Sequence, residues 1–561
     1  MATVTPAYID EEIDKHLLSL SNLRAQKNAF LPICRLPPEI LANIFTHGAR
    51  DYHENNGLSG FRIPGWVNVS YVCRHWRNVA LDCPTLWTYH FTASLRWTEE
   101  LLVRSKQASL RIRICCDSLT PGSWWSALLE RLLSHAERIQ ELRLRVPTVV
   151  LPSKLILCGP RLEILDICVL WSNPFEWTSV IDDGDIPSLR TLQLTDCLLP
   201  WHSLNLTGLT TLFLCRVPAQ SKQNIVEFLA TLGRLQSLTV LHLEHALASA
   251  REVLSSRTSE VSPKTGLPCL ARLLVAAPLS TALVLLSRVI FPSKAEVRVE
   301  FQSEDSSSAG DFAEIPSVLA RRFRQSEDLS SLSPTIRSLV IRFPVYLEPT
   351  FTFCLSERGD CDPGLSMMYP PRDCNDSPVT LVAIDQGWMF GEMEHIISDI
   401  CCSIPLIHVQ TLHVIHPPPS LYFWEKTLGH LYGLKLLKLS DGTMPNLVPL
   451  LALAAEESVG TPRGTSDCAP TPGLTYTPAL EELVLDRIKL TYGDNALTDV
   501  ISEKSLLDAF STRKAPRPRL TMIECGHVED DYPDPESDIE DDDSPYPFGF
   551  YLSESSLDEY Y

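Results

Sequence analysis

A short apolar pattern returns along most of this chain, and it restricts the fold more than any other feature. It consists of an apolar residue, two variable residues, an apolar residue, one variable residue and a third apolar residue. Ten copies begin, in chain order, at Ile139, Leu162, Leu189, Leu209, Leu238, Leu270, Ile336, Val409, Leu434 and Leu480. A lone strand cannot bury these side chains, each of which contributes about 1.5–3 kcal/mol when buried. The pattern therefore predicts copies stacked as parallel strands.

The spacing of the copies indicates a repeat. The central apolar residues of the first six copies lie 23, 27, 20, 29 and 32 residues apart, close to the period of about 20–29 residues of leucine-rich repeats. The later steps of 66, 73, 25 and 46 residues indicate missed copies. We expect Val297/Val299 and Val382/Ile384 to fill the first two gaps.

Residues 96–526 thus resemble an irregular leucine-rich repeat domain, although only Leu189–Leu199, with Cys197, shows the full motif. The resemblance implies an α/β solenoid with parallel strands. Helices on its convex side are expected at residues 225–232, 282–289 and 447–454. The alternative is an ordinary α/β protein, whose buried parallel strands also form apolar runs.

Two apolar stripes at helical spacing precede the repeats. The Pro37-Pro38 pair suits the first turn of a helix, so a helix of little more than two turns is expected to start near Pro37. Its stripe consists of Ile40, Leu41, Ile44 and Phe45. The second stripe consists of Val69, Val72, Cys73, Trp76, Val79 and Ala80, and Pro84 ends that helix.

The order of these residues, with Leu36 before them and Leu86-Trp87 after them, resembles an F-box, and we assign residues 30–95 to it. That family docks on the Skp-family adaptor of SCF ubiquitin ligases, which also contain cullin and RING subunits. The resemblance implies an adaptor contact made by Leu36, Pro37, Ile40, Leu41, Ile44, Phe45, Val72, Trp76 and Val79, some of which could instead form the core of the module. Residues 46–68 depart from the family pattern, and their glycines and proline predict a surface loop.

Residues 1–29 are expected to form an amphipathic helix starting at Thr5-Pro6. Its stripe consists of Ile9, Ile13, Leu17, Leu20 and Leu23. Such a helix ahead of the F-box is similar to fungal F-box proteins. It could pack on the F-box, the interpretation we favour, or pair with another helix.

Charge is concentrated at the end of the chain. The net charge is −21, and thirteen Asp or Glu residues with no Lys or Arg lie between Glu529 and Tyr561. Residues 527–561 are therefore expected to be a disordered acidic tail. Because phosphate binding needs a concentrated basic face, nucleic acid is not the expected ligand. A membrane span and a secretory signal are not expected either, which favours the cytoplasm or the nucleus.

The chain shows no arrangement typical of an enzyme or of a metal site. Its seventeen cysteines include no Cys-x-x-Cys, and we interpret most of them as small buried hydrophobes. Residues 182–185 (Asp-Asp-Gly-Asp) are interpreted as a solvated loop, and a metal site formed by Cys354, Cys361 and Cys374 in a loop is not favoured. No cofactor is expected. Four polar inserts are expected to be mobile loops: residues 255–266, 302–310, 357–377 and 457–477.

Residues beside the core positions of the repeats are expected to line the concave face. Those assigned to target binding are Arg143, Arg145, Phe213, His242, Arg272, Arg342, His413 and Lys438. The face is chemically mixed, which favours a protein ligand. The F-box and the repeats together predict a non-catalytic substrate receptor of an SCF ligase. An interaction scaffold without a role in ubiquitination and an enzyme hidden in the inserts are the alternatives.

Overall fold

The computed structural model describes about two thirds of the chain, and every structural statement below concerns these residues. They are 5–55, 65–90, 95–116, 122, 124–151, 159–170, 175–176, 186–198, 206–217, 225–248, 250, 264–292, 295–302, 314–324, 336–343, 350–356, 379–384, 390–404, 406–418, 420–443, 447, 450–451, 477–490, 503–512 and 517–527. The acidic tail and most of the four polar inserts, residues 182–185, Cys361 and Cys374 lie outside them. Among the described helices, none is long and apolar enough to cross a membrane.

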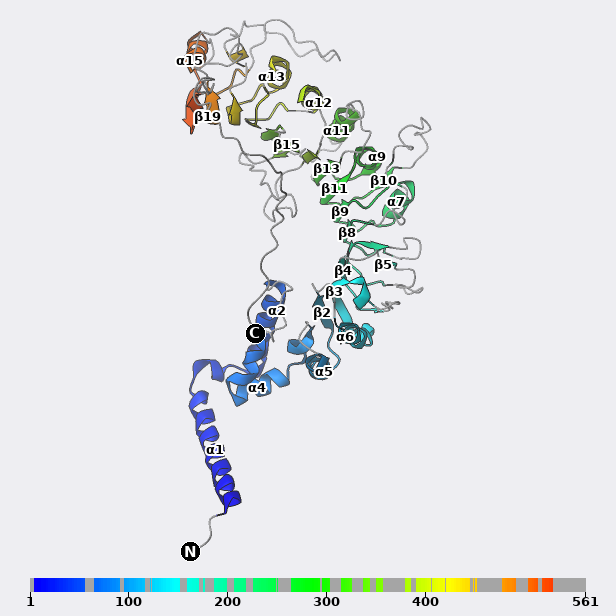
Figure 1. The fold of residues 1–561 in the computed structure, drawn as a ribbon, viewed down its shortest axis with the longest axis vertical. Helices are drawn as coiled ribbons and strands as arrows, with labels where there is room; N and C mark the ends of the chain where they lie inside the picture. The colour runs from blue at the N-terminus through cyan, green and yellow to red at the C-terminus, as the bar shows by residue number, and fades with distance from the viewer. Residues whose placement is uncertain are drawn as a thin grey trace, which may run out of the picture.

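A small helical module follows a long N-terminal helix (Figure 1). The long helix is α1 (Pro6–Ala29), and the module consists of η1 (Pro32–Arg35), α2 (Pro38–Asn55), η2 (Gly65–Asn68), α3 (Val69–Val72), α4 (Arg74–Leu81) and η3 (Pro84–Thr88). Helix α2 has 18 residues, so the expectation of a helix little longer than two turns is wrong. The first half of the predicted loop at residues 46–68 continues this helix because Ala49 is buried and Tyr52 packs on the same core.

The second predicted helix is broken at Cys73. Its backbone is extended there (φ −158°, ψ 169°), and its Sγ accepts a hydrogen bond from the backbone N–H of Trp76 at 3.5 Å. Cys73 therefore ends α3 and caps the start of α4. The apolar spacing predicted one helix because it does not reveal a single extended residue, and Val72 of the predicted stripe is exposed while Ser70 is buried.

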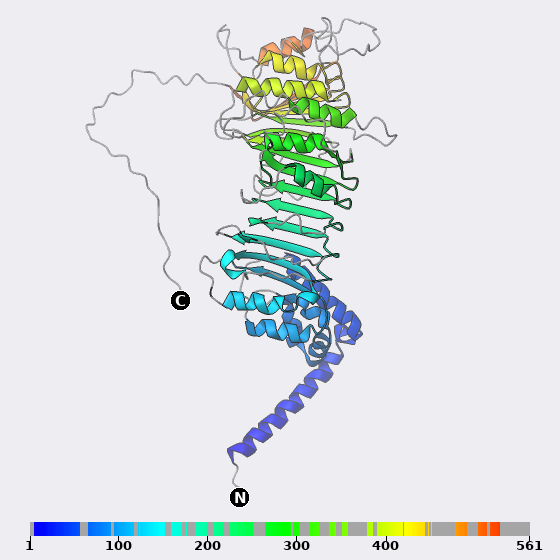
Figure 2. The same cartoon turned by 90° about the vertical axis from the view of Figure 1, so that its right-hand side faces the viewer.

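The rest of the described chain is a mixed α/β region with a sheet of seventeen strands. In chain order they are β1 (Tyr89–His90), β2 (Leu110–Cys115), β3 (Ile139–Pro147), β4 (Ile164–Leu170), β6 (Thr191–Thr195), β8 (Thr211–Cys215), β9 (Val240–Glu244), β11 (Arg272–Pro278), β13 (Glu296–Gln302), β14 (Ser338–Arg342), β15 (Thr350–Ser356), β16 (Val379–Ile384), β17 (Thr411–Ile415), β18 (Leu436–Thr443), β19 (Glu482–Leu490), β20 (Arg519–Ile523) and β21 (Gly526–His527). Nearly all neighbouring strands run parallel, as predicted. Figure 2 shows them stacked along the long axis of the molecule.

The repeated pattern sets the register of this sheet. Leu142 pairs with Leu165, and the central residues of the next four copies continue the same row in adjacent strands. All three apolar residues of each of the ten copies are buried. The row continues to Val297, which confirms that predicted copy, and two further copies that the pattern missed are Ile112/Ile114 and Leu520/Met522.

The predicted copy at Val382/Ile384 is wrong by three residues. Val379 pairs with Val297 and Leu381 with Val299, and Leu381 is buried, so Val379 and Leu381 hold the positions of the copy. An apolar run of this kind contains two possible alternations, and only pairing with a neighbouring strand selects one of them.

Strand order also departs from chain order in one place. The sheet runs β13, β16, β15, β14, β17, and β15 is antiparallel to both of its neighbours. After β13 the chain leaves two positions of the sheet empty and forms β14. Strands β15 and β16 then fill these two positions, and β17 pairs with the other edge of β14. Cys354, predicted to lie in a loop, is a buried residue of β15. The expectation of parallel strands therefore fails at β15.

A left-handed residue ends many of the strands. Seven non-glycine residues have φ between 48° and 57° two positions after the last apolar residue of a copy: Asp196, Arg216, His245, His416, Asp441, Arg487 and Glu524. The backbone N–H groups of Asp196, Arg216, His245 and His416 donate to a carbonyl of the neighbouring strand, as from Arg216 to Glu244 at 2.8 Å and from His245 to Ala276 at 2.9 Å. Each such hydrogen bond continues the ladder of the sheet one residue past the strand.

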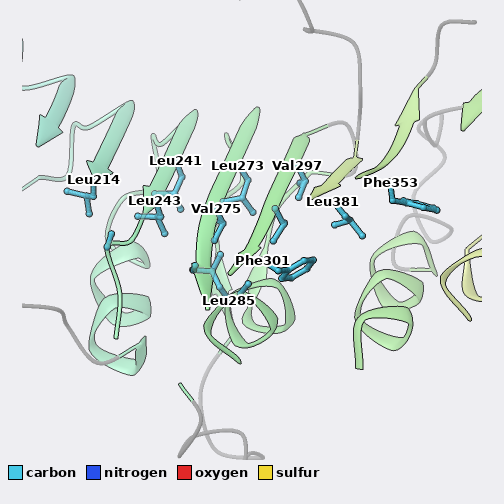
Figure 3. Packing of buried hydrophobic residues seen from close by; sticks show 14 of the residues in the cluster. Leu214, Leu241, Leu243, Leu273, Val275, Leu285, Val297, Phe301, Phe353 and Leu381 are labelled. Carbon is cyan, nitrogen blue, oxygen red and sulfur yellow. The ribbon is translucent and has the colours of Figure 1, made fainter. Parts of the chain in front are cut away.

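Helices cover the outer side of the sheet, and the strands form the inner side of an arc (Figure 1). They are α5 (Leu95–Arg104), α6 (Trp124–Leu133), α7 (Ile225–Leu232), α9 (Leu279–Arg288), α11 (Glu314–Arg324), α12 (Phe390–Ser403), α13 (Leu421–Leu428) and α15 (Glu503–Thr512). Figure 3 shows side chains of neighbouring strands, such as Leu241, Leu273 and Val297, directed between the sheet and these helices. The predicted helix at 225–232 is confirmed, the one at 282–289 starts at Leu279, and most of residues 447–454 are not described.

The remaining described elements are short. They are η4 (Ala136–Arg138), η5 (Thr148–Val150) and two small parallel sheets, one of β5 (Phe175–Glu176) with β7 (Cys197–Leu198) and one of β10 (Thr265–Gly266) with β12 (Val289–Ile290). Strand β10 forms the end of the insert predicted as a loop at residues 255–266. Its Thr265 hydroxyl donates a hydrogen bond to the carbonyl of Leu229 in α7 at 3.2 Å, which holds it to the helical layer.

Candidate protein-interaction surfaces

The helical module has a sealed core. Leu41, Phe45 and Val79 are buried together with Leu86 and Trp87. The Trp87 indole N–H donates a hydrogen bond to the carbonyl of Ala80 at 2.7 Å, which satisfies the only polar atom of that side chain. Three residues predicted to contact the adaptor therefore lie inside the module.

Other apolar residues of the same helices face outward. Ile40 and Ile44 are 46% and 47% exposed on α2, and Val72 is 59% exposed on α3. Pro37 is exposed, while Leu36 and Trp76 are half-buried against the core. A candidate that the sequence reasoning missed is Tyr71, which is 69% exposed beside Val72. The two large adjacent apolar residues in a short helix were the available signal, since only one of them can point into the core.

We call Pro37, Ile40, Ile44, Tyr71 and Val72 the outward apolar set. Water-exposed isoleucine, valine and tyrosine side chains lose free energy on transfer to an apolar surface, by about 25 cal/mol for each Å² buried. A surface of this composition suits a protein partner better than a polar ligand.

The module is joined to the sheet by shared elements. Strand β1 pairs with β2, and helix α5 contributes Leu101 to the core of the module and Leu102 to the core of the sheet. Arg131 of α6 forms an ion pair with Glu99 of α5 at 2.5 Å. The module and the first strands therefore form one continuous packed unit.

A charged cluster reinforces this junction. The ring of His53, near the end of α2, lies 3.8 Å from the carboxylate of Glu141 in β3, and Arg143 contacts the same carboxylate at 2.5 Å. Arg113 donates a hydrogen bond to the backbone carbonyl of His53. Burial of Glu141 opposes its ionisation, but His53 and Arg143 outweigh that effect and lower its pKa to about 2. Glu141 is therefore charged at neutral pH and lies beside His53 of α2 at the junction.

The inner face of the sheet carries the residues assigned to target binding. Arg143, Asp166, Gln193, Phe213 and His242 form one row across five neighbouring strands. The rings of Phe213 and His242 meet edge to face, with centroids 4.2 Å apart. Burial lowers the pKa of His242 to about 4, although Glu244 lies 3.9 Å away, so the imidazole is neutral at pH 7.

Most of the other predicted residues of this face have charged or polar partners. Arg272 pairs with Glu296 at 2.7 Å, and Lys438 pairs with Asp486 at 3.0 Å. The remaining three are placed differently. His413 lies 2.9 Å from the hydroxyl of Ser440, Arg342 is buried, and Arg145 is exposed. The structure thus brings Phe213 and His242 together, and His413 beside Lys438, but it does not gather all eight residues at one site.

Chemistry other than protein binding finds little support in the described part of the chain. No group of three or more His, Cys, Asp or Glu side chains there is arranged to hold a metal ion. The described cysteines are free thiols, and Cys197, Cys215 and Cys401 are among the buried ones. Burial raises the pKa of the Cys215 thiol to about 12, with Glu244 adding to the effect, so this cysteine is not a thiolate at neutral pH.

Comparison with known proteins identifies one part of the chain. A family model described as F-box-like matches residues 33–93, which span η1 to β1 and the outward apolar set. No curated protein matches the chain. The helical module of this protein is therefore an F-box-like domain, followed by a mixed α/β region with parallel strands.

Proposed function

We propose that this protein is a substrate-recognition subunit of an SCF ubiquitin ligase. In this proposal the F-box-like domain binds a Skp-family adaptor, which connects it to the cullin and RING subunits. The chain itself performs no chemistry and needs no cofactor. Its contribution is to hold a target near a ubiquitin-charged enzyme, which raises the effective concentration of the reacting groups.

The observation that carries the proposal is the outward apolar set on an F-box-like domain. Ile40 and Ile44 follow each other by one helical turn on α2, and they are exposed while their neighbours Leu41 and Phe45 are buried. The core of the domain does not include Ile40 and Ile44, so these two side chains are not required to fill it. Burial of apolar side chains against an adaptor would stabilise a complex.

We further propose that the α/β region is an irregular leucine-rich repeat solenoid that binds the target on its inner face. Support comes from the recurrence of one pattern, buried in register in neighbouring strands. The Phe213–His242 pair lies within the inner row, where an aromatic contact can anchor a protein ligand. The cytoplasm or the nucleus is the proposed location because the partners of an SCF ligase act there.

The test is co-purification of a Skp-family adaptor with the full chain and with an Ile40→Asp, Ile44→Asp variant. A matched control is Asn78→Asp, Thr85→Asp, which adds the same charge at exposed positions of α4 and η3. We expect adaptor binding to fall more than tenfold in the first variant and to be retained in the control, with equal circular dichroism spectra. Absence of adaptor binding by the wild-type chain would refute the proposal.

The second candidate function is an interaction scaffold that binds the adaptor without supporting ubiquitination. Many side chains of the inner face already form ion pairs or hydrogen bonds with each other, and fewer of them are left to bind a target. This observation favours the scaffold. Co-purification of the wild-type chain with adaptor but without cullin would select this function. Recovery of a complete complex that transfers ubiquitin would exclude it.

A further inference from the structure

Helix α1 exposes an apolar stripe between Ile9 and Leu23. Ile9, Ile13, Leu17, Leu20 and Leu23 are 44–60% exposed, and α1 contributes no buried residue. At 100° per residue these five side chains occupy a stripe about 120° wide, as on a helix that packs against another element. The prediction that α1 packs on the F-box-like domain is therefore wrong for the isolated chain.

Within the part of the chain that the structure describes, α1 contacts the rest of the molecule near its C-terminal end. It follows directly into η1, and Arg74 of α4 donates a hydrogen bond to the side chain of Asn22 at 2.9 Å. Figures 1 and 2 both show α1 projecting away from the F-box-like domain as an arm. With 24 residues it is about 36 Å long. Most helices in proteins gain their stability from packing an apolar face against another element. We therefore expect the exposed stripe of α1 to bind a partner.

The charges of α1 indicate which partner fits. Its first twelve residues, 6–17, carry four acidic side chains and one lysine, and its last twelve, 18–29, carry Arg24 and Lys27 and no acidic residue. Two copies of this helix attract each other when they run in opposite directions, because the acidic half of each then lies beside the basic half of the other. In a parallel pair the two acidic halves would repel each other.

We propose that two copies of this chain associate through an antiparallel pair of α1 helices. Pairing Ile9 with Leu23 of the second copy, and Ile13 with its Leu20, brings the two stripes face to face. Asp10 then lies at the level of Arg24 of the second copy, on the same side of the stripe. The arrangement is isologous, so each contact occurs twice.

The antiparallel direction also suits the shape of the molecule. Each F-box-like domain follows the C-terminal end of its own α1, so antiparallel pairing places the two domains at opposite ends of a rod about 36 Å long. The two domains are therefore separated by about the length of the helix. This inference does not rest on the proposed function, since its measurement is the oligomeric state of the purified chain.

The first test measures the molar mass of the full chain by light scattering after gel filtration at 1–50 μM, roughly the range in which weak dimers form. We expect the wild type to approach twice 62.8 kDa as concentration rises, and an Ile13→Asp, Leu20→Asp variant to remain at 62.8 kDa. The matched control is Leu18→Asp, Ala25→Asp, which places the same charges seven residues apart on the opposite face of α1. The control should dimerise like the wild type.

A charge exchange tests the direction of the helices. We expect Asp10→Lys alone and Arg24→Glu alone each to weaken self-association at low salt, since each creates two like-charge contacts. An equimolar mixture of the two variants should dimerise again, because the introduced lysine of one chain then meets the introduced glutamate of the other, and Asp10 meets Arg24. A mixture no more dimeric than the separate variants would overturn the antiparallel arrangement. A wild-type chain that stays monomeric at 50 μM, or a control as monomeric as the stripe variant, would overturn the proposal itself.

Discussion

The N-terminal part, which consists of α1 and the F-box-like domain, differs from the α/β region in how many large apolar side chains it exposes. More than half of the large apolar side chains that the structure describes as exposed lie between residues 8 and 72, although this is a small part of the chain. In the α/β region the apolar residues of the repeated pattern are buried, and the inner face carries mainly charged, polar and aromatic groups.

The two surfaces are suited to two kinds of protein binding. Apolar residues on the N-terminal part suit a stable partner, because burial of apolar surface is the main favourable term of association. Charged pairs and polar groups on the inner face suit selection among targets, since electrostatic complementarity contributes more to specificity than to affinity. In the proposed function, one chain holds a permanent partner at one end and discriminates among targets at the other.

The largest expected effect distinguishes core from surface within α2. Leu41→Ala should lower the free energy of unfolding by about 2–5 kcal/mol, because it removes a fully buried side chain and leaves a cavity. Ile40→Ala should change it by less than about 0.5 kcal/mol, because Ile40 is half exposed. Urea unfolding followed by tryptophan fluorescence measures both variants. Equal losses of stability would show that the domain is not divided into core and outward residues as described.

The next effect concerns the junction between the two regions. Glu141→Gln should destabilise contact between α2 and β3 at neutral pH, by roughly 3 kcal/mol if the whole pKa shift from 4.5 to about 2 contributes. The folded-state pKa is lowered, so this stabilisation is present above pH 4.5 and is lost as pH falls toward 2. The stability of this contact should therefore become equal in the wild type and the variant at acid pH.

Hydrogen exchange of residues 50–55 and 139–147 at several pH values measures this prediction. Glu163→Gln is a suitable control, because it neutralises an acidic residue close to the start of β4, outside the junction. If the exchange rates of wild type and Glu141→Gln differ as much at pH 2.5 as at pH 7, the ionised Glu141 carboxylate is not what stabilises the junction.

The smallest effect tests the left-handed residues at the ends of the strands. His245 has a φ of 50°, and its N–H bonds to the carbonyl of Ala276. A β-branched residue is strained there and glycine is not, so His245→Val should be less stable than His245→Gly by about 1–2 kcal/mol. Both substitutions remove the imidazole, so the difference isolates the backbone. Thermal unfolding of the two variants gives the comparison, and equal stabilities would mean that the turn relaxes.

Local patterns predicted a large part of the structure. Alternation at period two identified the buried positions of ten strands, and helical spacing identified the core of the F-box-like domain, because both depend on neighbours within a few residues. The left-handed residues escaped prediction since none of them is glycine, the usual marker of such a conformation. Helix α2 was predicted too short because Gly57, Gly60, Pro64 and Gly65 indicated a loop over residues 46–68, yet Ala49 and Tyr52 pack on the core.

The sequence by itself determined that apolar residues of the repeated pattern would be buried in parallel strands and that an F-box-like set of helices would precede them. Only the tertiary structure decided the order β13, β16, β15, β14, β17, the register of residues 379–384, and the exposure of Ile40 beside the buried Leu41. Periodicity is a property of adjacent residues, whereas strand order and burial depend on which distant segment supplies the hydrogen bonds and the opposing surface.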